Sequence, residues 1–414
     1  MDVIDKYLAR YAEPEVASCG FVSDNFQYCL VIPAYQETWL QVQKVWGKLD
    51  RNLLIILVAN APDSEDVITR ELIDDVKNES NIMHQSGSLT YLRSHDKHCI
   101  LLVDRCHHPI PRRQGVGLAR KIGADIALSL ITTGRVRCPF IFNTDADVEL
   151  PVDYFSALSV QGNVAAAIYP FTHRPESATQ LACYLYEISL LYYSAGLRYA
   201  QSPYAFHNIG STLIVSASHY AQVRGFPGRN AGEDFYLLNK LAKTGRIVTL
   251  KQPELQLSGR FSDRVAFGTG TGIEKIHNLV NPERDLLFYN PRIFVRLRQF
   301  LAELKSSHRV SADSRFSMPE TNHWCEEVKL QGLINEKQKQ RSAVFLKFTD
   351  DWMDAFRTLK FVHFMREHYD PSLPLQEIFD GTVLPCDGRE LPLEKLRSYL
   401  RQRHSVDDVN DRQI

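Results

Sequence analysis

Two aspartates separated by one residue follow an apolar run near the middle of the chain. The run Pro139–Asn143 has the length and composition of a buried strand, and Asp145-Ala146-Asp147 comes directly after it. Two carboxylates placed at a strand end can reach one hard divalent cation, Mg²⁺ or Mn²⁺. Such a cation neutralises a diphosphate and stabilises it as a leaving group. The alternative is a solvated acidic turn, and the position at a strand end argues against it.

Arginines occur in two segments that could bind an anion. Arg260 and Arg264 lie in a loop rich in serine and glycine, where paired guanidinium groups can clamp a phosphate or a carboxylate. Arg113 lies in a loop that leads into a predicted helix, and a helix N-terminus favours anions. For both segments the alternative is a solvated surface loop.

The elements that would position these residues alternate between apolar strands and amphipathic helices. Continuous apolar strands separated by helices indicate a parallel sheet covered on both faces. Ligands bind beyond the carboxyl ends of such strands. The functional loops are therefore expected at 33–37, 60–63, 104–115 and 144–149. The strands are expected at 28–32, 53–59, 99–103 and 139–143, the helices at 38–49 and 115–132, and a loop or weak helix at 80–98.

The second half of the chain is less regular. Strands are expected at 164–169, 211–216 and 247–250, and helices at 175–200 and 233–244. From residue 281 the sequence becomes helical and charged, and its clearest amphipathic piece has apolar residues at helical spacing between Ile293 and Leu304. We therefore expect an N-terminal helix and connector (1–25), a catalytic domain (26–280) and a helical accessory domain (281–414). The accessory domain is expected to pack on the catalytic domain or to form a subunit interface in a homo-oligomer, in preference to resting on a membrane.

Composition narrows the class of protein. The chain has 414 residues, of which 44% are hydrophobic and 23% charged, as in folded globular proteins. A formal net charge of −1 argues against a general nucleic-acid binder. No apolar run is long enough for a transmembrane helix, and no secretory signal is evident. The eight cysteines are scattered and are expected to be reduced, which favours a cytoplasmic protein.

Four motifs in order resemble the GT-A glycosyltransferases, specifically family 2. They are Val31-Ile32-Pro33-Ala34-Tyr35-Gln36-Glu37, then Val58-Ala59-Asn60-Ala61-Pro62-Asp63, then Asn143-Thr144-Asp145-Ala146-Asp147, and then Gly232-Glu233-Asp234. The resemblance covers roughly residues 26–270. It implies a GT-A fold with a mixed, mostly parallel sheet and a transferase that uses a nucleotide sugar.

The resemblance also implies roles for individual residues. Asp145 would bind ribose or metal, and Asp147 would be the main ligand of Mn²⁺ or Mg²⁺. Asp234 would be the general base of an inverting transfer, and Glu233 would orient the acceptor. A third metal ligand would be His277 or His207. Donor contacts would come from Pro33, Ala34, Tyr35, Glu37, Asn60, Arg113, Arg120, Asp145, Ala146, Arg260 and Arg264.

Several alternatives stay open at this stage. A UDP-sugar is the favoured donor and a GDP-sugar the alternative, because Asn60 stands where many members have an aspartate. A retaining transferase acting on a small acidic acceptor such as a glycerate shares these features. A non-catalytic sugar- or nucleotide-binding protein is the alternative of another class. A phosphatase of the haloacid dehalogenase type would place its aspartates on the first strand, and a nucleotidyltransferase would need a glycine-rich loop there.

Overall fold

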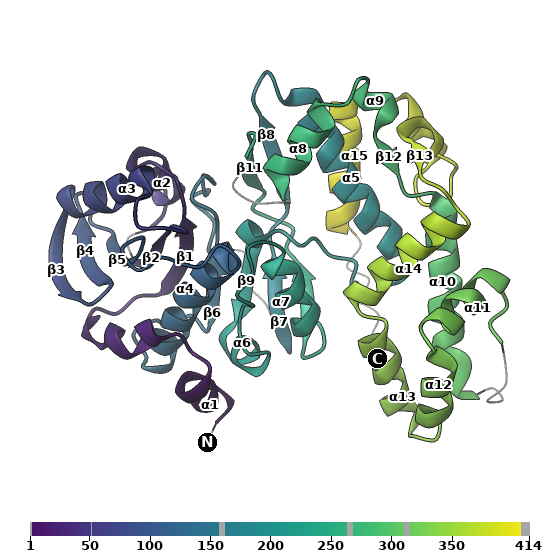
Figure 1. Ribbon diagram of the computed structural model, residues 1–414, viewed down its shortest axis with the longest axis horizontal. Helices are drawn as coiled ribbons and strands as arrows, with labels where there is room; N and C mark the ends of the chain where they lie inside the picture. The colour runs from purple at the N-terminus through teal and green to yellow at the C-terminus, as the bar shows by residue number, and fades with distance from the viewer. Residues whose placement is uncertain (1, 51, 157–161, 263–267, 310–314, 407–414) are drawn as a thin grey trace. The chain divides into compact units, whose positions relative to one another are not determined.

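The structure, a computed structural model, describes residues 2–50, 52–156, 162–262, 268–309 and 315–406. The chain forms two compact units (Figure 1). The first consists of Met1–Glu176 and Asn208–Thr271, and the second of Ser177–His207 and Gly272–Ile414. This division differs from the expected domain at 26–280, because residues 177–207 pack with the C-terminal helices.

A nine-stranded sheet forms the centre of the first unit. Every strand except β4 and β9 points in the same direction. The expected mixed and mostly parallel α/β fold is therefore confirmed. The strand order is β10 (Arg246–Thr249), β7 (Val164–Ile168), β9 (Leu213–Ser216), β6 (Phe140–Asn143), β1 (Tyr28–Ala34), β2 (Leu53–Asn60), β5 (Cys99–Arg105), β4 (Leu89–Ser94), β3 (Ser80–Ser86).

The strand order reverses between β1 and β6. From β1 the chain adds β2 and β5 on one side, and then returns to place β6 on the other side of β1. In open α/β sheets a ligand crevice lies beyond the carboxyl ends of the strands at such a reversal. All eight residues of β2 are buried, as expected for a central strand covered on both faces. The topology thus directs attention to the loops after β1, β2 and β6.

Helices cover both faces of this sheet. Helix α4 (Gly115–Thr132) packs on β1, β2 and β6, and it lies on the opposite side from α2 (Trp39–Trp46) and α3 (Val67–Asn78) in Figure 1. That arrangement follows from right-handed crossovers, because the chain reverses its direction across the sheet before β6. Helices α6 (Ala217–Gln222) and α7 (Glu233–Leu241) accompany β9, β7 and β10.

The expectation of a loop or weak helix at 80–98 is wrong. Strands β3 and β4 form an antiparallel hairpin there, with Gly87 in the left-handed conformation at the turn. Strand β3 is the edge of the sheet and exposes most of its side chains, so its sequence lacks the apolar run of a buried strand. Edge strands commonly carry such polar sequences.

A second, two-stranded sheet brings a later segment to the loop after β6. Its parallel strands are β8 (Phe171–Pro175) and β11 (Leu255–Gly259). Gln256 of β11 also forms an isolated bridge with Glu149, four residues after Asp145. Because Arg260 directly follows β11, this bridge holds it beside the turn that contains the two aspartates.

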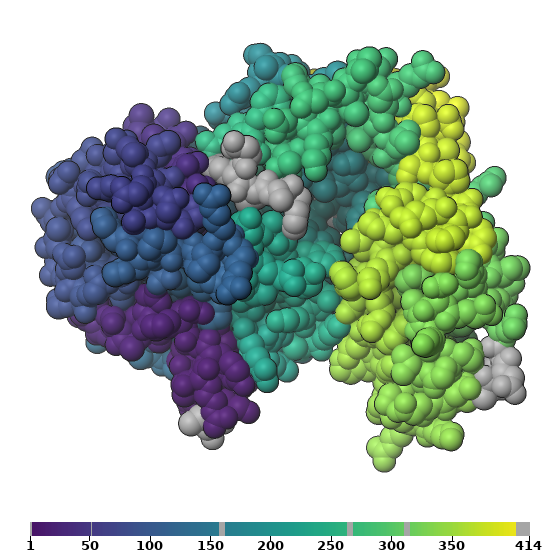
Figure 2. All heavy atoms as spheres, viewed as in Figure 1, coloured from purple at the N-terminus to yellow at the C-terminus, as the bar shows by residue number. Residues whose placement is uncertain are grey.

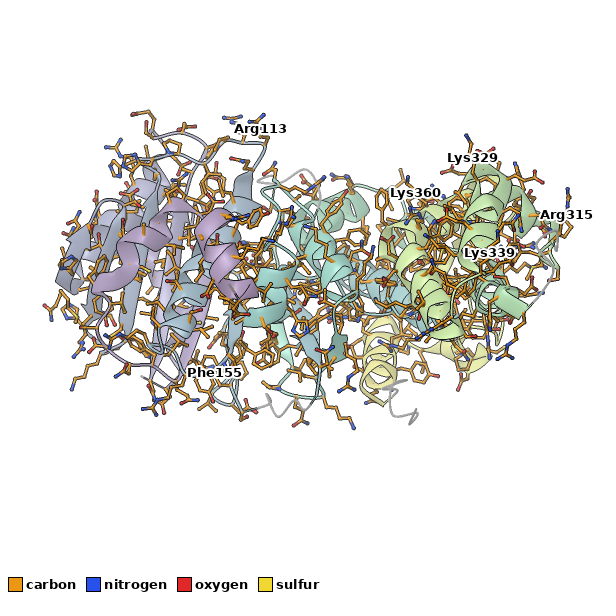
Figure 3. All side chains as sticks on the ribbon, turned by 90° about the horizontal axis from the view of Figure 1, so that it is seen from below. Arg113, Phe155, Arg315, Lys329, Lys339 and Lys360 are labelled. Atoms are coloured by element: carbon orange, nitrogen blue, oxygen red, sulfur yellow. The ribbon has the colours of Figure 1, made fainter. Side chains whose placement is uncertain are left out.

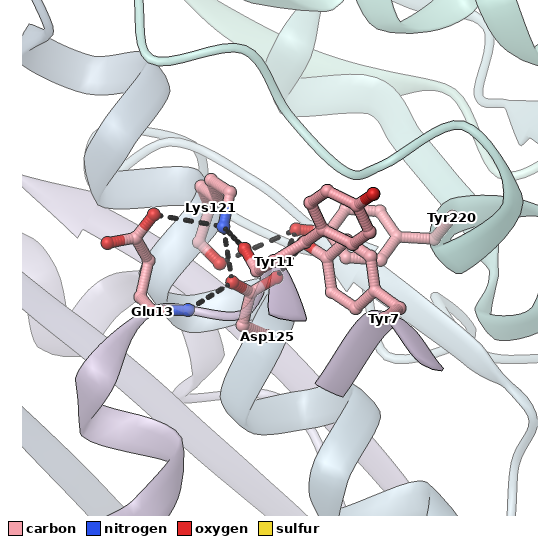
Figure 4. A network of polar contacts seen from close by, with 6 residues as sticks. All are labelled: Tyr7, Tyr11, Glu13, Lys121, Asp125 and Tyr220. Carbon is pink, nitrogen blue, oxygen red and sulfur yellow. Dashed lines mark hydrogen bonds and ion pairs between the residues drawn. The ribbon is translucent and has the colours of Figure 1, made fainter. Parts of the chain in front are cut away.

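A buried polar network attaches the N-terminal segment to α4. The segment contains α1 (Val3–Arg10) and η1 (Pro14–Phe21), and α1 forms the purple projection from the first unit in Figure 2. Asp125 is fully buried, and its Oδ1 accepts hydrogen bonds from the hydroxyls of Tyr7 (2.6 Å) and Tyr220 (2.8 Å) (Figure 4). Its Oδ2 accepts from Lys121 Nζ (2.7 Å) and from the backbone N–H of Glu13 (2.9 Å). The carboxylate therefore joins α1, α4 and α6.

The second unit is mainly helical and has its own core. The apolar residues expected on one face of α10 (Pro291–Ser306) are all buried in it, namely Ile293, Phe294, Leu297, Phe300, Leu301 and Leu304. No helix among the described residues is long and apolar enough to cross a membrane. The elements are α5 (Gln180–Tyr199), α8 (Thr269–His277, which begins in the first unit), α9 (Pro282–Asp285), β12 (Leu287–Phe288), α10 (Pro291–Ser306), η3 (Ser307–Arg309), α11 (Pro319–Glu327), α12 (Leu330–Lys337), α13 (Ser342–Trp352), α14 (Ala355–His368), β13 (Leu373–Pro374), η4 (Leu375–Glu377), η5 (Cys386–Glu390) and α15 (Leu393–Val406).

A buried ion cluster explains why α5 belongs to the second unit. Glu187 of α5 is fully buried and forms ion pairs with Arg397 (2.9 Å) and Arg401 (2.7 Å) of α15. Breaking such a pair leaves an uncompensated buried charge, so the two helices are held together. The sequence pattern alone gives no sign of this pairing, since the partners are more than 200 residues apart.

We expect Asp125→Asn to lower the free energy of unfolding by about 3 kcal/mol, because the substitution removes the buried partner of Lys121 and leaves that cation paired with the partly exposed Glu13. Tyr7→Phe removes one hydrogen bond to that carboxylate and should cost about 1.5 kcal/mol. Urea denaturation measures both. Asp5→Asn, an exposed acid on the same N-terminal helix, is the control and should stay within about 0.5 kcal/mol of the wild type. An Asp125→Asn variant as stable as that control would contradict this account of the network.

Candidate functional site

The turn after β6 carries the two aspartates at the carboxyl edge of the sheet. The backbone N–H of Thr144 donates to the carbonyl of Val31 (3.1 Å), so the turn begins against β1. Ala146 is buried, whereas the side chains of Asp145 and Asp147 remain 43% and 23% exposed. The two carboxylates are therefore accessible to a ligand beyond the carboxyl edge of the sheet, whereas the alanine between them packs inward.

Arg120 of α4 binds two acidic residues from different parts of the chain. Its Nε donates to Glu233 Oε1 (2.9 Å), and its Nη2 pairs with Asp145 Oδ1. The side chain is only 3% exposed. The sequence predicts Arg120 as a donor contact, but the structure uses its guanidinium to fix the turn after β6 to the start of α7. We therefore describe Arg120 as a positioning residue.

The position of Arg120 requires a glycine at residue 210. Gly210 is buried at the start of the short η2 segment (Gly210–Thr212), and a Cβ atom there would lie 2.7 Å from Arg120 Nη2. A contact that short forces the guanidinium to move. Gly210 is thus a site residue that the sequence analysis did not identify. Its local sequence, Asn208-Ile209-Gly210-Ser211, gives no signal of the close approach of Arg120.

Arg260 joins a second pair of carboxylates. It pairs with Glu37, which follows β1, and with Asp147 Oδ2 (3.0 Å). Glu37 is 3% exposed in its side chain. Its inward direction follows from Gln36, which has a positive φ of 52° and whose N–H donates to Thr69 Oγ1 (3.1 Å). A non-glycine residue in that conformation is held there by its surroundings.

Glu233 and Asp234 open α7, preceded by Gly232 in the left-handed conformation. Glu233 is buried against Arg120, whereas Asp234 keeps part of its surface exposed. Burial, together with the negative charge of Glu233, raises the pKa of Asp234 to about 7. A carboxyl group with a pKa near neutrality can exchange a proton with a ligand at physiological pH.

The loops after β1 and β2 supply the remaining residues predicted near the donor. Pro33 and Ala34 are buried as the last residues of β1, and Tyr35 is half-buried just beyond them. Asn60 ends β2 and is 6% exposed, and its Oδ1 accepts no hydrogen bond from any described residue. A buried amide oxygen without a donor is uncommon and costs free energy, which is consistent with a place for a ligand.

Of the remaining predicted site residues, Arg113 lies in the first unit but not in this cluster, and the others lie in the second unit or outside the described residues. Arg113 is exposed, and Figure 3 shows its side chain at the periphery of the first unit. The N–H of Gly117 at the start of α4 donates instead to the carbonyl of Arg229, so the expected anion site at that helix N-terminus is partly occupied. Arg264 lies outside the described residues. His277 is exposed at the last turn of α8 in the second unit, and His207 is buried in the same unit.

Two buried polar groups directly before the aspartates were also missed. Asn143 Oδ1 and Thr144 Oγ1 are fully buried and have no hydrogen-bond partner among the described residues. Polar residues at the end of an otherwise apolar strand are the signal that could have identified them. Both residues lie at the carboxyl end of β6, directly before Asp145.

The carboxylates fit a divalent cation only if a ligand completes its coordination. Within the described parts of the chain no three His, Cys, Asp or Glu side chains converge as a metal site. Mg²⁺, however, is commonly held by one or two carboxylates together with substrate phosphates and water. Four acids, Glu37, Asp145, Asp147 and Glu233, face two guanidinium groups here, so the cluster retains negative charge for a cation.

Comparison with known proteins does not assign a function to these site residues. No family model and no curated protein matches the chain. One similar solved structure is a mannosyltransferase from Pyrobaculum calidifontis in complex with GDP-mannose and Mn²⁺, with a TM-score of 0.35 and 14% identity. That likeness covers 99% of this chain and 93% of the other. At this level of similarity the function has to be inferred from the side chains.

The raised pKa of Asp234 predicts how stability depends on pH. Its pKa is about 7 in the folded protein and 3.8 ordinarily, so between these values the folded state binds a proton that the unfolded chain releases. The contribution of Asp234 to stability therefore falls as the pH rises through this range. Between pH 4 and pH 8 the free energy of unfolding of Asp234→Asn should therefore rise by about 1–3 kcal/mol relative to that of the wild type. This energy allows for the partial exposure of Asp234.

Chemical denaturation of the two proteins across this pH range measures that difference. Glu233→Gln is the matched variant, because it removes the neighbouring negative charge and should lower the pKa of Asp234. The pH-dependent loss of stability that Asp234 causes should then end at a lower pH. A difference between Asp234→Asn and the wild type that is constant from pH 4 to pH 8 would show that Asp234 has an ordinary pKa.

Proposed function

We propose that this protein is a metal-dependent glycosyltransferase of the GT-A type, which moves a sugar from a nucleotide diphosphate to a hydroxyl acceptor. The observation that carries the proposal is the cluster at the β1/β6 reversal of the sheet, in which Asp145 pairs with Arg120 and Asp147 with Arg260, together with Asp234 at the start of α7. A crevice at this position suits a nucleotide. Carboxylates for a cation, an arginine for phosphate and a carboxyl base within one site suit transfer from a diphosphate leaving group.

Different residues of the first unit are assigned to the nucleoside, the metal and the diphosphate. The loops after β1 and β2, with Tyr35 and Asn60, are assigned to the nucleoside. Asp147, with Asp145, would hold Mn²⁺ or Mg²⁺, which when bound neutralises the diphosphate and stabilises its departure. Arg260 would contact the diphosphate through its guanidinium. Arg120 keeps Asp145 and Glu233 in place throughout.

Asp234 is the proposed general base. It would accept the proton of the acceptor hydroxyl as that oxygen attacks the anomeric carbon from the side opposite the diphosphate. Glu233, held by Arg120, would orient the acceptor beside it. One displacement of this kind inverts the anomeric configuration. A pKa near 7 allows Asp234 to be deprotonated at neutral pH and still basic enough to accept a proton.

A retaining transfer to a small acidic acceptor is the second candidate. The observation that favours it is the partly exposed guanidinium of Arg260, which could bind an acceptor carboxylate instead of the diphosphate. The anomeric configuration of the product, determined by NMR, separates the two mechanisms. A non-catalytic sugar- or nucleotide-binding role would give no product from any donor.

A donor screen tests the proposed activity directly. Thermal-shift measurements with UDP- and GDP-sugars, each with and without Mn²⁺, should reveal a donor that stabilises the protein only in the presence of the metal. Hydrolysis or transfer of that donor should then depend on Mn²⁺ or Mg²⁺. Metal-independent stabilisation by every donor, without turnover, would favour the non-catalytic role.

Asp147→Ala should abolish metal-dependent donor binding and leave the fold intact. The side chain lies in a partly exposed turn, so its removal creates no cavity in the core. Calorimetric titration with UDP or GDP in the presence of Mn²⁺ measures the loss. Asp153→Ala, an exposed acid six residues further along, should bind as the wild type does. If Asp147→Ala binds the nucleotide and Mn²⁺ as tightly as that control, the metal assignment is wrong.

Asp234→Asn should lower turnover roughly 100-fold with little change in donor affinity, because general-base assistance contributes about that much. In the wild type, turnover should rise with pH through about 7, since the base acts when it is deprotonated. Glu233→Gln should shift this rise to lower pH, because it removes a charge that raises the pKa of Asp234. Near-normal turnover of Asp234→Asn would exclude the inverting mechanism with this base.

A further inference from the structure

The residue predicted as the main metal ligand is already neutralised by an arginine. Arg260 Nη2 lies 3.0 Å from Asp147 Oδ2 and also pairs with Glu37. These two acids follow different strands, β6 and β1, so the guanidinium bridges the two loops on either side of the sheet reversal. The guanidinium therefore pairs with a carboxylate that a divalent cation would also bind.

The contacts of Arg260 differ from those of Arg120 in a way that allows Arg260 to exchange its carboxylate partners for another acceptor. Arg120 is 3% exposed and belongs to the long helix α4. Arg260 is 25% exposed and lies in the loop after the short strand β11. Its Nε is buried but donates to no described acceptor, so the guanidinium does not use its full capacity for hydrogen bonds. An arginine held in this way can move to a better acceptor.

A diphosphate is such an acceptor. Guanidinium groups bind phosphate through paired, charge-assisted hydrogen bonds that are stronger than neutral ones. A divalent cation on Asp147 competes with Arg260 for the negative charge of that carboxylate, and the two cations repel each other at this distance. We propose that Arg260 is an exchangeable counter-ion, which holds Asp147 and Glu37 while the site is empty and transfers to the donor diphosphate when the cation binds Asp147.

This inference rests on the proposed function and adds a rule for the order of binding. The cation binds weakly to the protein alone and strongly once a nucleoside diphosphate is present. The nucleoside diphosphate in turn binds more tightly when the cation is present, because coupling between two ligands is reciprocal. The exchange also keeps the carboxylates of the empty site compensated, which a buried Glu37 requires.

Mn²⁺ binding to the full-length protein tests the exchange, with free Mn²⁺ followed by electron paramagnetic resonance. Without nucleotide, Arg260→Gln should bind Mn²⁺ about tenfold more tightly than the wild type, since the competing cation is gone. Arg260→Lys keeps the positive charge and should remain close to the wild type. Addition of UDP or GDP should tighten Mn²⁺ binding by the wild type about tenfold, and by Arg260→Gln much less.

Arg137→Gln is the matched control, because it removes an exposed arginine of the same unit that belongs to neither the cluster nor the predicted site, and its Mn²⁺ affinity should equal that of the wild type. Thermal unfolding establishes that each variant is folded. An Arg260→Gln variant that binds Mn²⁺ no more tightly than the wild type without nucleotide overturns the exchange, whether or not the protein transfers sugar. An absence of any effect of UDP and GDP on all variants instead overturns the proposed function together with the transfer of Arg260 to diphosphate.

Discussion

The site depends on the burial of one guanidinium group. A charged side chain that is 3% exposed, as in Arg120, loses nearly all of its hydration, and this costs several kcal/mol unless charged partners compensate it. Asp145 and Glu233 provide that compensation from segments almost 90 residues apart in the chain. The turn after β6 and the start of α7 are therefore fixed to the same point on α4. The room for this arrangement comes from Gly210, where any side chain would displace the guanidinium.

Two arginines with different exposure give the site a fixed part and an exchangeable part. Arg120 holds the side of the crevice that carries Glu233 and Asp234, where the acceptor is proposed to bind. Arg260 holds the side that carries Glu37 and Asp147, where the diphosphate is proposed to bind. Because both arginines neutralise carboxylates, the ligand-free first unit carries an acidic cluster without strong repulsion. A pKa of about 7 for Asp234 shows that part of this repulsion and the cost of burial remain.

Much of the first unit could be predicted from the sequence, because its central strands are continuous apolar runs. The runs at β1, β2, β5 and β6 are long enough to identify and are separated by amphipathic helices. Strand β3 escaped notice because an edge strand exposes its side chains and has no apolar pattern. The membership of 177–207 in the second unit could not be predicted either, since it depends on Glu187 meeting arginines of α15. Contacts between residues so distant in the chain leave no local pattern.

In the site too, features that depend on a local sequence pattern can be predicted, whereas contacts between distant residues cannot. The positions of Asp145, Asp147, Glu37 and Asn60 follow from strand ends, which the sequence predicts well. The pairing of Arg120 with Glu233 and of Arg260 with Glu37 is a matter of three-dimensional geometry. It gives Arg120 a positioning role that the sequence does not reveal, whereas its contact with the donor stays a prediction. A crystal structure with Mn²⁺ and UDP or GDP, in which anomalous scattering locates the metal, tests whether this cluster binds a metal–nucleotide complex. We expect Mn²⁺ in contact with Asp147 and the diphosphate, beyond the carboxyl ends of β1 and β6, with Arg120 still bound to Glu233. A nucleotide bound elsewhere, or Mn²⁺ with no contact to Asp147, would contradict this expectation.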